Sequence, residues 1–294
     1  MTLAPIVLFV YNRPWHTKQT IETLQKNNLA SDSELFIYSD AAKHHKDVAS
    51  VQDVRDYIHN VTGFKNIKII ERETNWGLAD SIIDGVTTIV NEYGKVIVLE
   101  DDLVTSPYFL KYMNDALTFY KDEEKVWHIS GWNYPIETEH TENVFLWRVM
   151  NCWGWATWSD KWAHYEKDVD KVINEFSSED KKAFNLDGVE DFFKQVYLNQ
   201  KGELNTWAIF WYASIFKNNG LCLNPVRTLV DNVGHDGSGV HCTAKKGYVD
   251  SLNNQDAFNV KIQQIEENSV CTKAIKNHLQ PPILGRALKK LLWK

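Results

Sequence analysis

Residues 95–102, which read Lys-Val-Ile-Val-Leu-Glu-Asp-Asp, constrain the fold more than any other stretch of the chain. The apolar run is too short to cross a membrane and is rich in β-branched residues, so it predicts a strand buried on both faces. Three carboxylates follow it at once. They must be paired or must hold a cation, because uncompensated charges at the end of a buried strand repel one another. Open α/β sheets bind ligands at the carboxyl ends of their strands, so the acids mark a candidate ligand site.

Strands and helices alternate along the first hundred residues. Apolar runs predict strands at 4–10, 34–38, 67–70 and 96–99, and helical spacing predicts helices at 17–26, 48–58 and 78–90. After the acids, Thr105-Ser106-Pro107 combines a capping hydroxyl with a first-turn proline, which predicts that the next helix starts here and runs to Tyr120. This alternation predicts an α/β fold with a mainly parallel sheet, helices on both faces and right-handed crossovers.

The pattern changes after residue 120. Further strands are predicted at 126–133, 144–148, 221–223 and 228–230. The tryptophan-rich run 152–158 is predicted to lead into a helix, and residues 168–201 are charged and helical. Residues 206–217 are apolar on nearly all sides, which predicts a buried helix that stops at Gly220. No repeat or clean linker separates these parts, so one folded unit is the default.

Composition argues against some classes of function. The formal net charge is −7 and no basic stripe precedes the extreme C-terminus, which argues against nucleic-acid binding. The cysteines are few, widely spaced and match no zinc pattern, so we expect reduced thiols in a cytoplasmic protein; they are Cys152, Cys222, Cys242 and Cys271. The 12 tryptophans, 12 tyrosines and 13 phenylalanines exceed what a core of this size needs, and aromatic rings commonly pack on sugar rings.

The C-terminal tail, residues 283–294, is short, basic and amphipathic and carries a terminal tryptophan. On an otherwise acidic protein such a segment suits an anionic membrane surface. A docked C-terminal helix explains the same pattern equally well. The sequence therefore leaves two expectations for the tail, which are peripheral contact with the inner face of the cytoplasmic membrane and a C-terminal helix docked on the protein.

Polar residues follow four of the predicted strands, at Asn12-Arg13, Asp40, 75–77 and 100–102. Because the carboxyl ends of parallel strands meet at one edge of a sheet, we expect these residues to lie close together. Mg²⁺ and Mn²⁺ prefer one or two carboxylates, with phosphate oxygens and water completing the shell. Such an ion neutralises a diphosphate and, if the diphosphate is a leaving group, acts as a Lewis acid on the departing oxygen. A satisfied cluster of ion pairs is the alternative interpretation.

The order of several motifs carries a family resemblance. Glu-Asp-Asp-Leu at 100–103 follows a buried strand; Pro-Tyr-Phe at 107–109, Trp-His-Ile-Ser-Gly-Trp-Asn at 127–133 and Gly-Trp at 154–155 come after it. In this order the chain resembles the metal-dependent glycosyltransferases of the GT-A fold. It is most similar to the N-acetylglucosaminyltransferase I type and its bacterial relatives in surface-polysaccharide synthesis. The resemblance covers roughly residues 4–242.

The resemblance implies a Rossmann-like GT-A catalytic domain at residues 1–242 with a smaller mixed C-terminal part. Residues 1–120 are its nucleotide-binding half, residues 121–242 are its acceptor-side half and a lid over the sugar donor, and residues 243–294 are a C-terminal extension. The implied reaction moves a hexose or N-acetylhexosamine from a nucleoside diphosphate, expected to be UDP, to a hydroxyl of a glycan or lipid-linked glycan. Mn²⁺ or Mg²⁺ is the implied cofactor, and inversion at the anomeric carbon is the implied stereochemistry.

The roles of individual residues follow from the resemblance one position at a time. Asp102 is implied to bind the metal, while Asp101 and Glu100 hold the ribose and the sugar. Arg13 is implied to contact the nucleotide, and Asp40 the uracil. These roles agree with the cluster of polar strand ends that the residues alone predict.

The glycine-rich segment, residues 234–241, reads Gly-His-Asp-Gly-Ser-Gly-Val-His. The resemblance implies a loop that orders over the diphosphate, with Ser238 and His241 facing it, and the residues themselves suit a mobile anion-binding turn. His235 and His241 are also candidates for a further metal ligand, because neutral imidazole binds Mn²⁺. Hydrogen bonding to a phosphate explains these histidines equally well.

One position departs from the family pattern. The family's catalytic base is an aspartate directly after a tryptophan, and this position aligns with Ala208 after Trp207. Alanine takes no proton, whereas an inverting transfer needs a base within hydrogen-bonding reach of the hydroxyl that attacks. The candidates are Asp236 in the glycine-rich segment and Glu203 upstream of the buried helix. Each has an ordinary reading, Asp236 as a turn residue before Gly237 and Glu203 as a solvated surface acid.

Tryptophans are the candidate wall for the glycan acceptor, since an indole stacks on a sugar face while its N–H reaches a hydroxyl. The candidates are Trp132, Trp153 and Trp155, with Trp158 close by in the sequence. Core packing explains at least half of them.

Two other functions use similar features. A sugar nucleotidyltransferase has a similar sheet, but its chemistry normally needs a glycine-rich, basic phosphate loop at the first strand–helix turn, where residues 11–14 read Tyr-Asn-Arg-Pro. A non-catalytic protein that binds glycans or nucleotide sugars, derived from a transferase, would explain Ala208. Binding of the sugar donor without turnover would separate this last reading from an enzyme.

Overall fold

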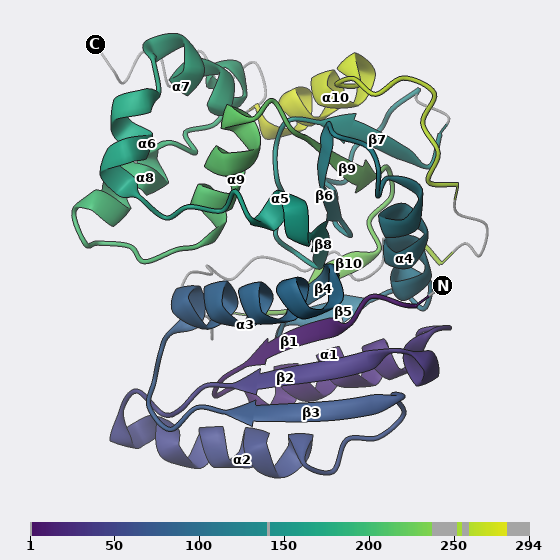
Figure 1. Cartoon of the computed structure of the whole chain (residues 1–294), viewed down its shortest axis with the longest axis vertical. Helices are drawn as coiled ribbons and strands as arrows, with labels where there is room; N and C mark the ends of the chain where they lie inside the picture. The colour runs from purple at the N-terminus through teal and green to yellow at the C-terminus, as the bar shows by residue number, and fades with distance from the viewer. Residues whose placement is uncertain (1, 140–141, 237–251, 255–258, 281–294) are drawn as a thin grey trace.

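The computed structural model describes residues 2–139, 142–236, 252–254 and 259–280. These residues form a large sheet of eight strands in the order β3-β2-β1-β4-β8-β6-β9-β7 (Figure 1). Its strands are β1 (Ile6–Val10), β2 (Glu34–Ser39), β3 (Asn66–Glu71), β4 (Lys95–Glu100), β6 (Val126–Ser130), β7 (Val144–Trp147), β8 (Trp155–Trp158) and β9 (Leu221–Pro225). A second, small sheet pairs β5 (Leu103–Thr105) with β10 (Val230–Asn232).

Helices cover both faces of the large sheet. They are α1 (Pro14–Gln25), α2 (Val48–Ile58), α3 (Leu78–Tyr93), α4 (Phe109–Phe119), α5 (Ser159–Trp162), α6 (Val169–Glu175), α7 (Ser178–Phe184), α8 (Lys194–Gln200), α9 (Ala208–Lys217) and α10 (Ser269–Leu279). Within the described part of the chain, none of them has both the length and the apolar character that crossing a bilayer requires.

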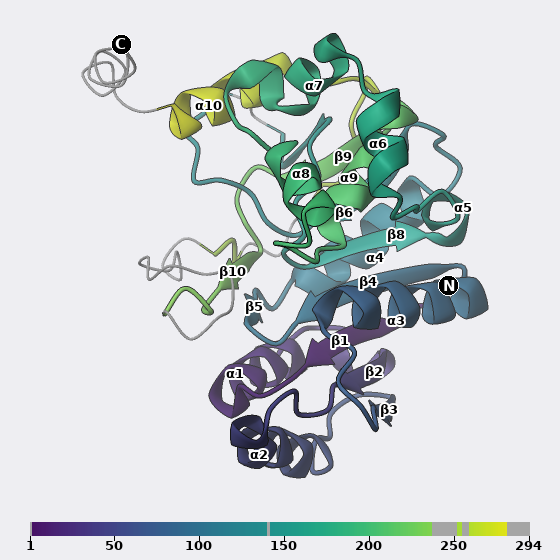
Figure 2. The same ribbon diagram turned by 90° about the vertical axis from the view of Figure 1, so that its left-hand side faces the viewer.

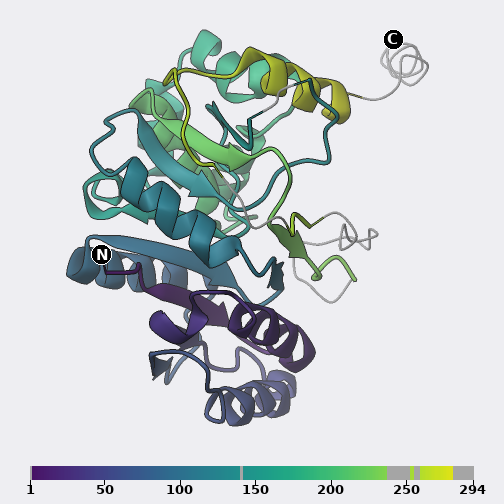
Figure 3. The same ribbon diagram turned by 90° about the vertical axis from the view of Figure 1, so that its right-hand side faces the viewer.

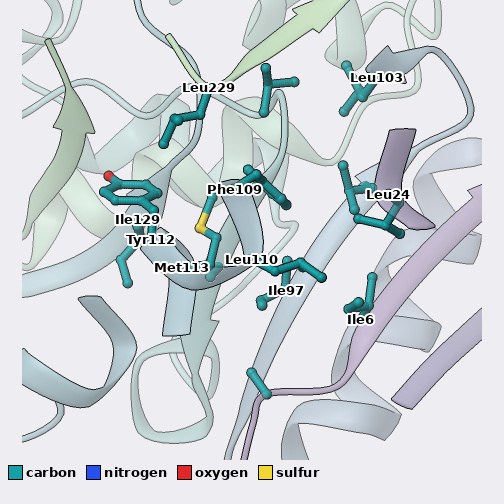
Figure 4. Close-up of a cluster of buried hydrophobic side chains, with 14 of the residues drawn as sticks. Ile6, Leu24, Ile97, Leu103, Phe109, Leu110, Tyr112, Met113, Ile129 and Leu229 are labelled. Carbon is teal, nitrogen blue, oxygen red and sulfur yellow. The ribbon is translucent and has the colours of Figure 1, made fainter. Parts of the chain in front are cut away.

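The first four strands confirm the predicted α/β fold. β1 pairs in parallel with β2 and β4, and β2 pairs in parallel with β3, so their carboxyl ends meet at one edge. All of β1 is buried, because α1 and α2 pack on one face of the sheet and α3 on the other. Figure 4 shows part of the first of these clusters, in which Leu24 of α1, Ile6 of β1 and Ile97 of β4 lie close to side chains of α4.

The tryptophan-rich run 152–158 differs from the prediction, because it contains a strand before the helix. β8 pairs antiparallel with β4 and with β6, and each of its four residues is buried. Trp155 belongs to one of the two core clusters and Trp158 to the other, so both faces of the strand are covered. The helix that follows, α5, is only four residues long. β8 therefore joins the parallel first half of the sheet to the mixed second half.

The segment after the three acids also differs from the prediction. Leu103–Thr105 forms the strand β5, and helix α4 begins only at Phe109. β5 pairs antiparallel with β10, with Leu103 opposite Asn232, and the Ser106 N–H donates to the Leu229 carbonyl at 2.8 Å. Figures 2 and 3 show the two strands side by side beyond the end of β4. Local sequence favours a helix start here, but pairing with a segment more than a hundred residues away decides the structure.

Most of the described tryptophans lie in the core. Trp155 stacks on Trp207 with ring centroids 5.0 Å apart, and it also stacks on His128. His128 accepts a hydrogen bond from the Trp211 indole N–H at 3.2 Å and donates to the Asn151 carbonyl at 3.0 Å. Burial lowers the pKa of His128 to about 3, so this imidazole is neutral at physiological pH. Aromatic packing around it accounts for much of the unusual composition.

Candidate functional site

The turn after β4 places three acids at the carboxyl edge of the sheet. Asp101 and Asp102 are each 6% exposed, and Glu100 is partly buried. The backbone of this turn is held from two sides. The Thr20 hydroxyl donates to the Asp101 carbonyl at 2.8 Å, and the Val233 N–H donates to the Asp102 carbonyl at 2.9 Å. The acids therefore sit on a fixed backbone.

Arg13 joins the acids from the neighbouring strand end. It follows β1 and precedes α1, and its Nη2 forms ion pairs with Asp101 and with Asp102, the latter at 2.8 Å. Burial lowers the pKa of Arg13, but the charges of Asp101 and Asp102 outweigh it and raise the pKa above its usual value. The sequence predicts that these strand ends lie together, and the structure brings them into contact. We call Arg13, Glu100, Asp101 and Asp102 the acidic edge.

The acidic edge holds more negative than positive charge. Burial, together with the charges of Asp102 and Asp101, raises the pKa of Glu100 to about 8 against the opposing effect of Arg13. Burial also raises the pKa of Asp101, although Arg13 opposes this shift. With a pKa of about 8, Glu100 is mostly protonated at neutral pH. The carboxylates of Asp101 and Asp102 still outnumber the one guanidinium, and a divalent cation would offset the excess negative charge. In the described part of the chain no three or more His, Cys, Asp or Glu side chains form a metal cage.

The start of the glycine-rich segment packs directly on the acidic edge. β5 and β10 bring it there, and a Cβ atom on Gly234 would lie 2.2 Å from the Asp102 Oδ2 and 2.9 Å from the Arg13 Nη1. No other residue fits at this position without moving the acids. Two residues later, the Asp236 Oδ2 lies 3.0 Å from the His16 Nε2 on the first turn of α1. His16 carries no recognisable sequence pattern, and this long-range contact is what links it to the site.

Asp40 follows β2 and organises the loop before α3. Its Oδ1 accepts hydrogen bonds from the N–H groups of Ala41 and Trp76, both at 2.9 Å. Its Oδ2 accepts from the Asn75 side chain at 2.9 Å and from the Gly77 N–H at 2.8 Å. These four bonds use the usual acceptor capacity of a carboxylate. In this structure Asp40 holds the 75–77 loop, and its contact with a uracil stays a prediction.

Of the other predicted site residues, some lie near Gly234 and others lie in the core or at the surface. Trp132 and Trp153 contact each other edge to face at 4.7 Å, and Trp153 contacts His235, next to Gly234. Trp155 is instead 1% exposed and packs inside the core, where no glycan reaches it without opening the fold. Glu203 is exposed between α8 and α9, and its N–H donates to the Leu198 carbonyl. Ser238 and His241 lie outside the described residues, as does the 283–294 tail.

Comparison with solved structures gives low similarity. TarS from S. aureus is 18% identical with a TM-score of 0.29, and the match covers 42% of this chain but only 21% of TarS. The mannosyltransferase PcManGT from Pyrobaculum calidifontis, solved with GDP-Man and Mn²⁺, is 9% identical with a TM-score of 0.42, covering 74% of this chain and 69% of that one. A UDP-glucose pyrophosphorylase complexed with UDP-glucose is 11% identical with a TM-score of 0.36, covering 76% and 90%.

Comparison with protein families is more informative. No curated protein matches the chain. The model of the GNT-I family matches residues 1–172, which is more than half of the 294 residues and includes the whole acidic edge. The match ends before α9, so Trp207 and Ala208 lie beyond it. The chain thus belongs to the GNT-I family and is a glycosyltransferase.

Proposed function

We propose that this enzyme moves a sugar from a uridine diphosphate to a hydroxyl group of a glycan, with the help of Mn²⁺ or Mg²⁺ and with inversion at the anomeric carbon. The observation that carries the proposal is the acidic edge, where buried carboxylates outnumber the one arginine that pairs with them. Residues 1–120 bind the nucleotide and residues 121–242 hold the acceptor side, with 243–294 as an extension. The resemblance to bacterial relatives supports a surface polysaccharide as the glycan and the cytoplasm as the location.

The residues of the acidic edge divide the work of holding the sugar donor. Asp102 would hold the cation, and Asp101 and Glu100 would hold the ribose and the transferred sugar. When bound, the cation neutralises the diphosphate and stabilises the charge that develops on the departing oxygen. Arg13 lies within reach of the same phosphates, because its guanidinium already spans Asp101 and Asp102. The bond from the anomeric carbon to the diphosphate breaks as the bond to the acceptor oxygen forms.

The proton of the attacking hydroxyl must go to a base other than residue 208. Ala208 begins α9 and carries no titratable group. Asp236 is the stronger of the two candidates, because it lies two residues from Gly234 and is held by His16 at 3.0 Å. Within the described residues no hydrogen bond or ion pair joins the Glu203 carboxylate to the acidic edge. We therefore assign the base role to Asp236 and a positioning role to His16.

Replacing Asp236 with asparagine is expected to lower the rate of transfer by a factor of about a hundred to ten thousand, since the amide cannot take the proton. Binding of UDP should change little, because the Asp236 carboxylate pairs with His16, which is not part of the acidic edge. Steady-state kinetics with titration calorimetry of UDP would measure both. Glu203→Gln is the matched control and should behave as wild type. If Glu203→Gln loses activity while Asp236→Asn keeps it, the base assignment is reversed.

Removal of metal tests the whole proposal. The purified chain is incubated with a panel of UDP- and GDP-sugars, and release of the nucleoside diphosphate is followed with and without EDTA. We expect turnover of a UDP-sugar, its loss on chelation, and its recovery when Mn²⁺ is added back in excess. Turnover that chelation leaves untouched would contradict the metal-dependent mechanism.

A non-catalytic protein that binds nucleotide sugars is the second candidate, and Ala208 is the observation that favours it. The two candidates differ in one measurement. Binding of a UDP-sugar by calorimetry, with no hydrolysis or transfer over long incubation with many glycans, would support the binding protein. Slow hydrolysis of the sugar donor that requires Asp102 would support the enzyme.

The basic tail, residues 283–294, is the proposed membrane contact. Deleting it is expected to move the protein from the bound to the free fraction in sedimentation with liposomes that contain anionic lipid. Liposomes of neutral lipid are the control and should bind neither form. Equal binding of the full-length and shortened chains to anionic liposomes would remove this proposal.

A further inference from the structure

Aromatic rings form a continuous path away from the acidic edge. His235, next to Gly234, lies 5.3 Å from Trp153, which lies 4.7 Å from Trp132. Trp132 contacts Tyr134 at 4.6 Å, and Tyr134 lies 5.9 Å from His278 on α10. All these distances are between ring centroids. We call these five residues the aromatic path. Its middle member, Trp132, is 7% exposed, whereas the other four reach the surface more fully.

The aromatic path ends at a cavity of about 770 Å³ between residues 135–139 and helix α10. Acidic, basic and amide groups line it together with apolar ones, including Glu137, Glu139, Lys273 and Asn277. The direction of the strands brings the segment that lines the cavity to the same edge of the sheet as the acidic edge. β8 runs antiparallel to both β4 and β6, so β6 points the same way as β4 and residues 131–139 leave the sheet at the edge where the acids lie.

Three buried polar atoms, each on a residue of the aromatic path or within two residues of one in the sequence, have no hydrogen-bond partner among the described residues. They are the Asn133 Oδ1, the Asn151 Nδ2 and the His235 Nδ1. Asn133 is 1% exposed and Asn151 is 9% exposed, and they lie within two residues of Trp132 and Trp153 in the sequence. Buried polar groups in folded proteins nearly always have a partner, either in the protein or in water or a ligand. All three atoms are shielded from solvent, so the partner that suits them is a buried water.

We infer that the aromatic path and the cavity at α10 form an extended subsite for the glycan acceptor. The inference rests on the proposed function and adds the substrate class, which is an oligosaccharide of several sugar residues rather than a single sugar. The apolar C–H face of a pyranose packs on Trp153 and Tyr134, whose rings are partly exposed. The distal sugars occupy the cavity, where Lys273 and Asn277 bind their polar groups. The end to be extended lies at the acidic edge.

The test uses the full-length protein on an array of defined oligosaccharides that range from single sugars to octasaccharides. Wild-type binding is expected to increase with the length of the glycan. Tyr134→Ala should lower the affinity for the longest bound glycan on the order of tenfold, as expected for loss of one aromatic contact. The double variant Lys273→Ala/Asn277→Ala should also lower the affinity for this glycan. Both side chains are exposed on α10, so the double variant is expected to fold even if Tyr134→Ala does not.

Tyr197→Ala is the matched control, because it removes an exposed tyrosine ring from α8, which is not part of the aromatic path. It should bind glycans as wild type does. Titration of UDP with Mn²⁺ into each variant separates this inference from the proposed function, since none of these residues belongs to the acidic edge. If the wild-type protein does not bind UDP in the presence of Mn²⁺, the proposed function is wrong. Three outcomes with normal UDP binding would overturn the inference. They are no binding of any glycan, an affinity that does not increase with glycan length, and glycan binding that is unchanged in both variants.

Discussion

Replacement of Asp102 by alanine is expected to lower sugar transfer by about a thousandfold or more, since removing a single group that stabilises the departing oxygen has effects of this size. Asp102 is 6% exposed and shares Arg13 with Asp101. After the change, Arg13 keeps Asp101 as its partner, so the acidic edge stays paired and the protein should fold. The loss is therefore expected in metal-dependent binding and turnover of the sugar donor and not in stability.

Three measurements together check this result: turnover of the UDP-sugar, calorimetric titration of UDP with Mn²⁺, and urea unfolding. Asp115→Ala is the matched control, because Asp115 is a half-exposed acid on α4 that pairs with Lys111, a residue outside the acidic edge. The control should resemble wild type in all three measurements. Full activity of Asp102→Ala would mean that the acids of this edge are only a structural cluster of ion pairs.

Gly234→Ala is expected to impair the site through a single methyl group. The new Cβ would lie 2.2 Å from the Asp102 Oδ2, a distance that real Cβ contacts do not show, so either the carboxylate or the segment must move. The segment has little freedom, because β10 pairs with β5 and the Val233 N–H bonds to the Asp102 carbonyl. We expect a loss of about 2 kcal/mol in the free energy of unfolding from overpacking. Displacement of Asp102 by about 1 Å should lower turnover on the order of a hundredfold.

The control for this change is Gly188→Ala. Gly188 has φ +86°, and no atom lies within 4 Å of its Cβ position, so alanine there brings backbone strain without a clash. It should cost about 1 kcal/mol of stability and leave turnover intact. Urea unfolding and donor turnover of both variants would be compared. Equal turnover in wild type and Gly234→Ala would show that the glycine-rich segment does not position Asp102.

The acidic edge was largely predictable because its information is local. β-branched runs predict β1 and β4, parallel pairing of neighbours brings their carboxyl ends together, and Arg13 and Asp102 come directly after those ends. The contact of Gly234 with Asp102 was less accessible, since it depends on the pairing of β5 with β10. The sequence predicts a strand at 228–230, which overlaps β10, but no local pattern marks β5 or its pairing with a strand more than a hundred residues away. The same reason explains why His16 could not be assigned a partner from the sequence.

The roles of the tryptophans, in contrast, could not be predicted from the sequence. Trp153 and Trp155 stand two residues apart, and the sequence offers the same roles for both. β8 begins at Trp155 and turns its ring into the core against Trp207, whereas Trp153 lies just before the strand and contacts His235. An indole suits either environment. Only the start of a strand, which composition does not reveal, separates a core residue from one beside the site.

The ion pairs of Arg13 affect how a nucleotide and a metal ion would bind together at the acidic edge. Its guanidinium pairs with both Asp101 and Asp102 and so offsets part of their negative charge, which a divalent ion would offset more fully. In the proposed mechanism an ion held by Asp102 competes with Arg13 for that carboxylate, and Arg13 loses less by releasing it when a pyrophosphate offers it another anion. On that proposal we expect the nucleotide and the ion to bind cooperatively, each with weaker affinity when the other is absent.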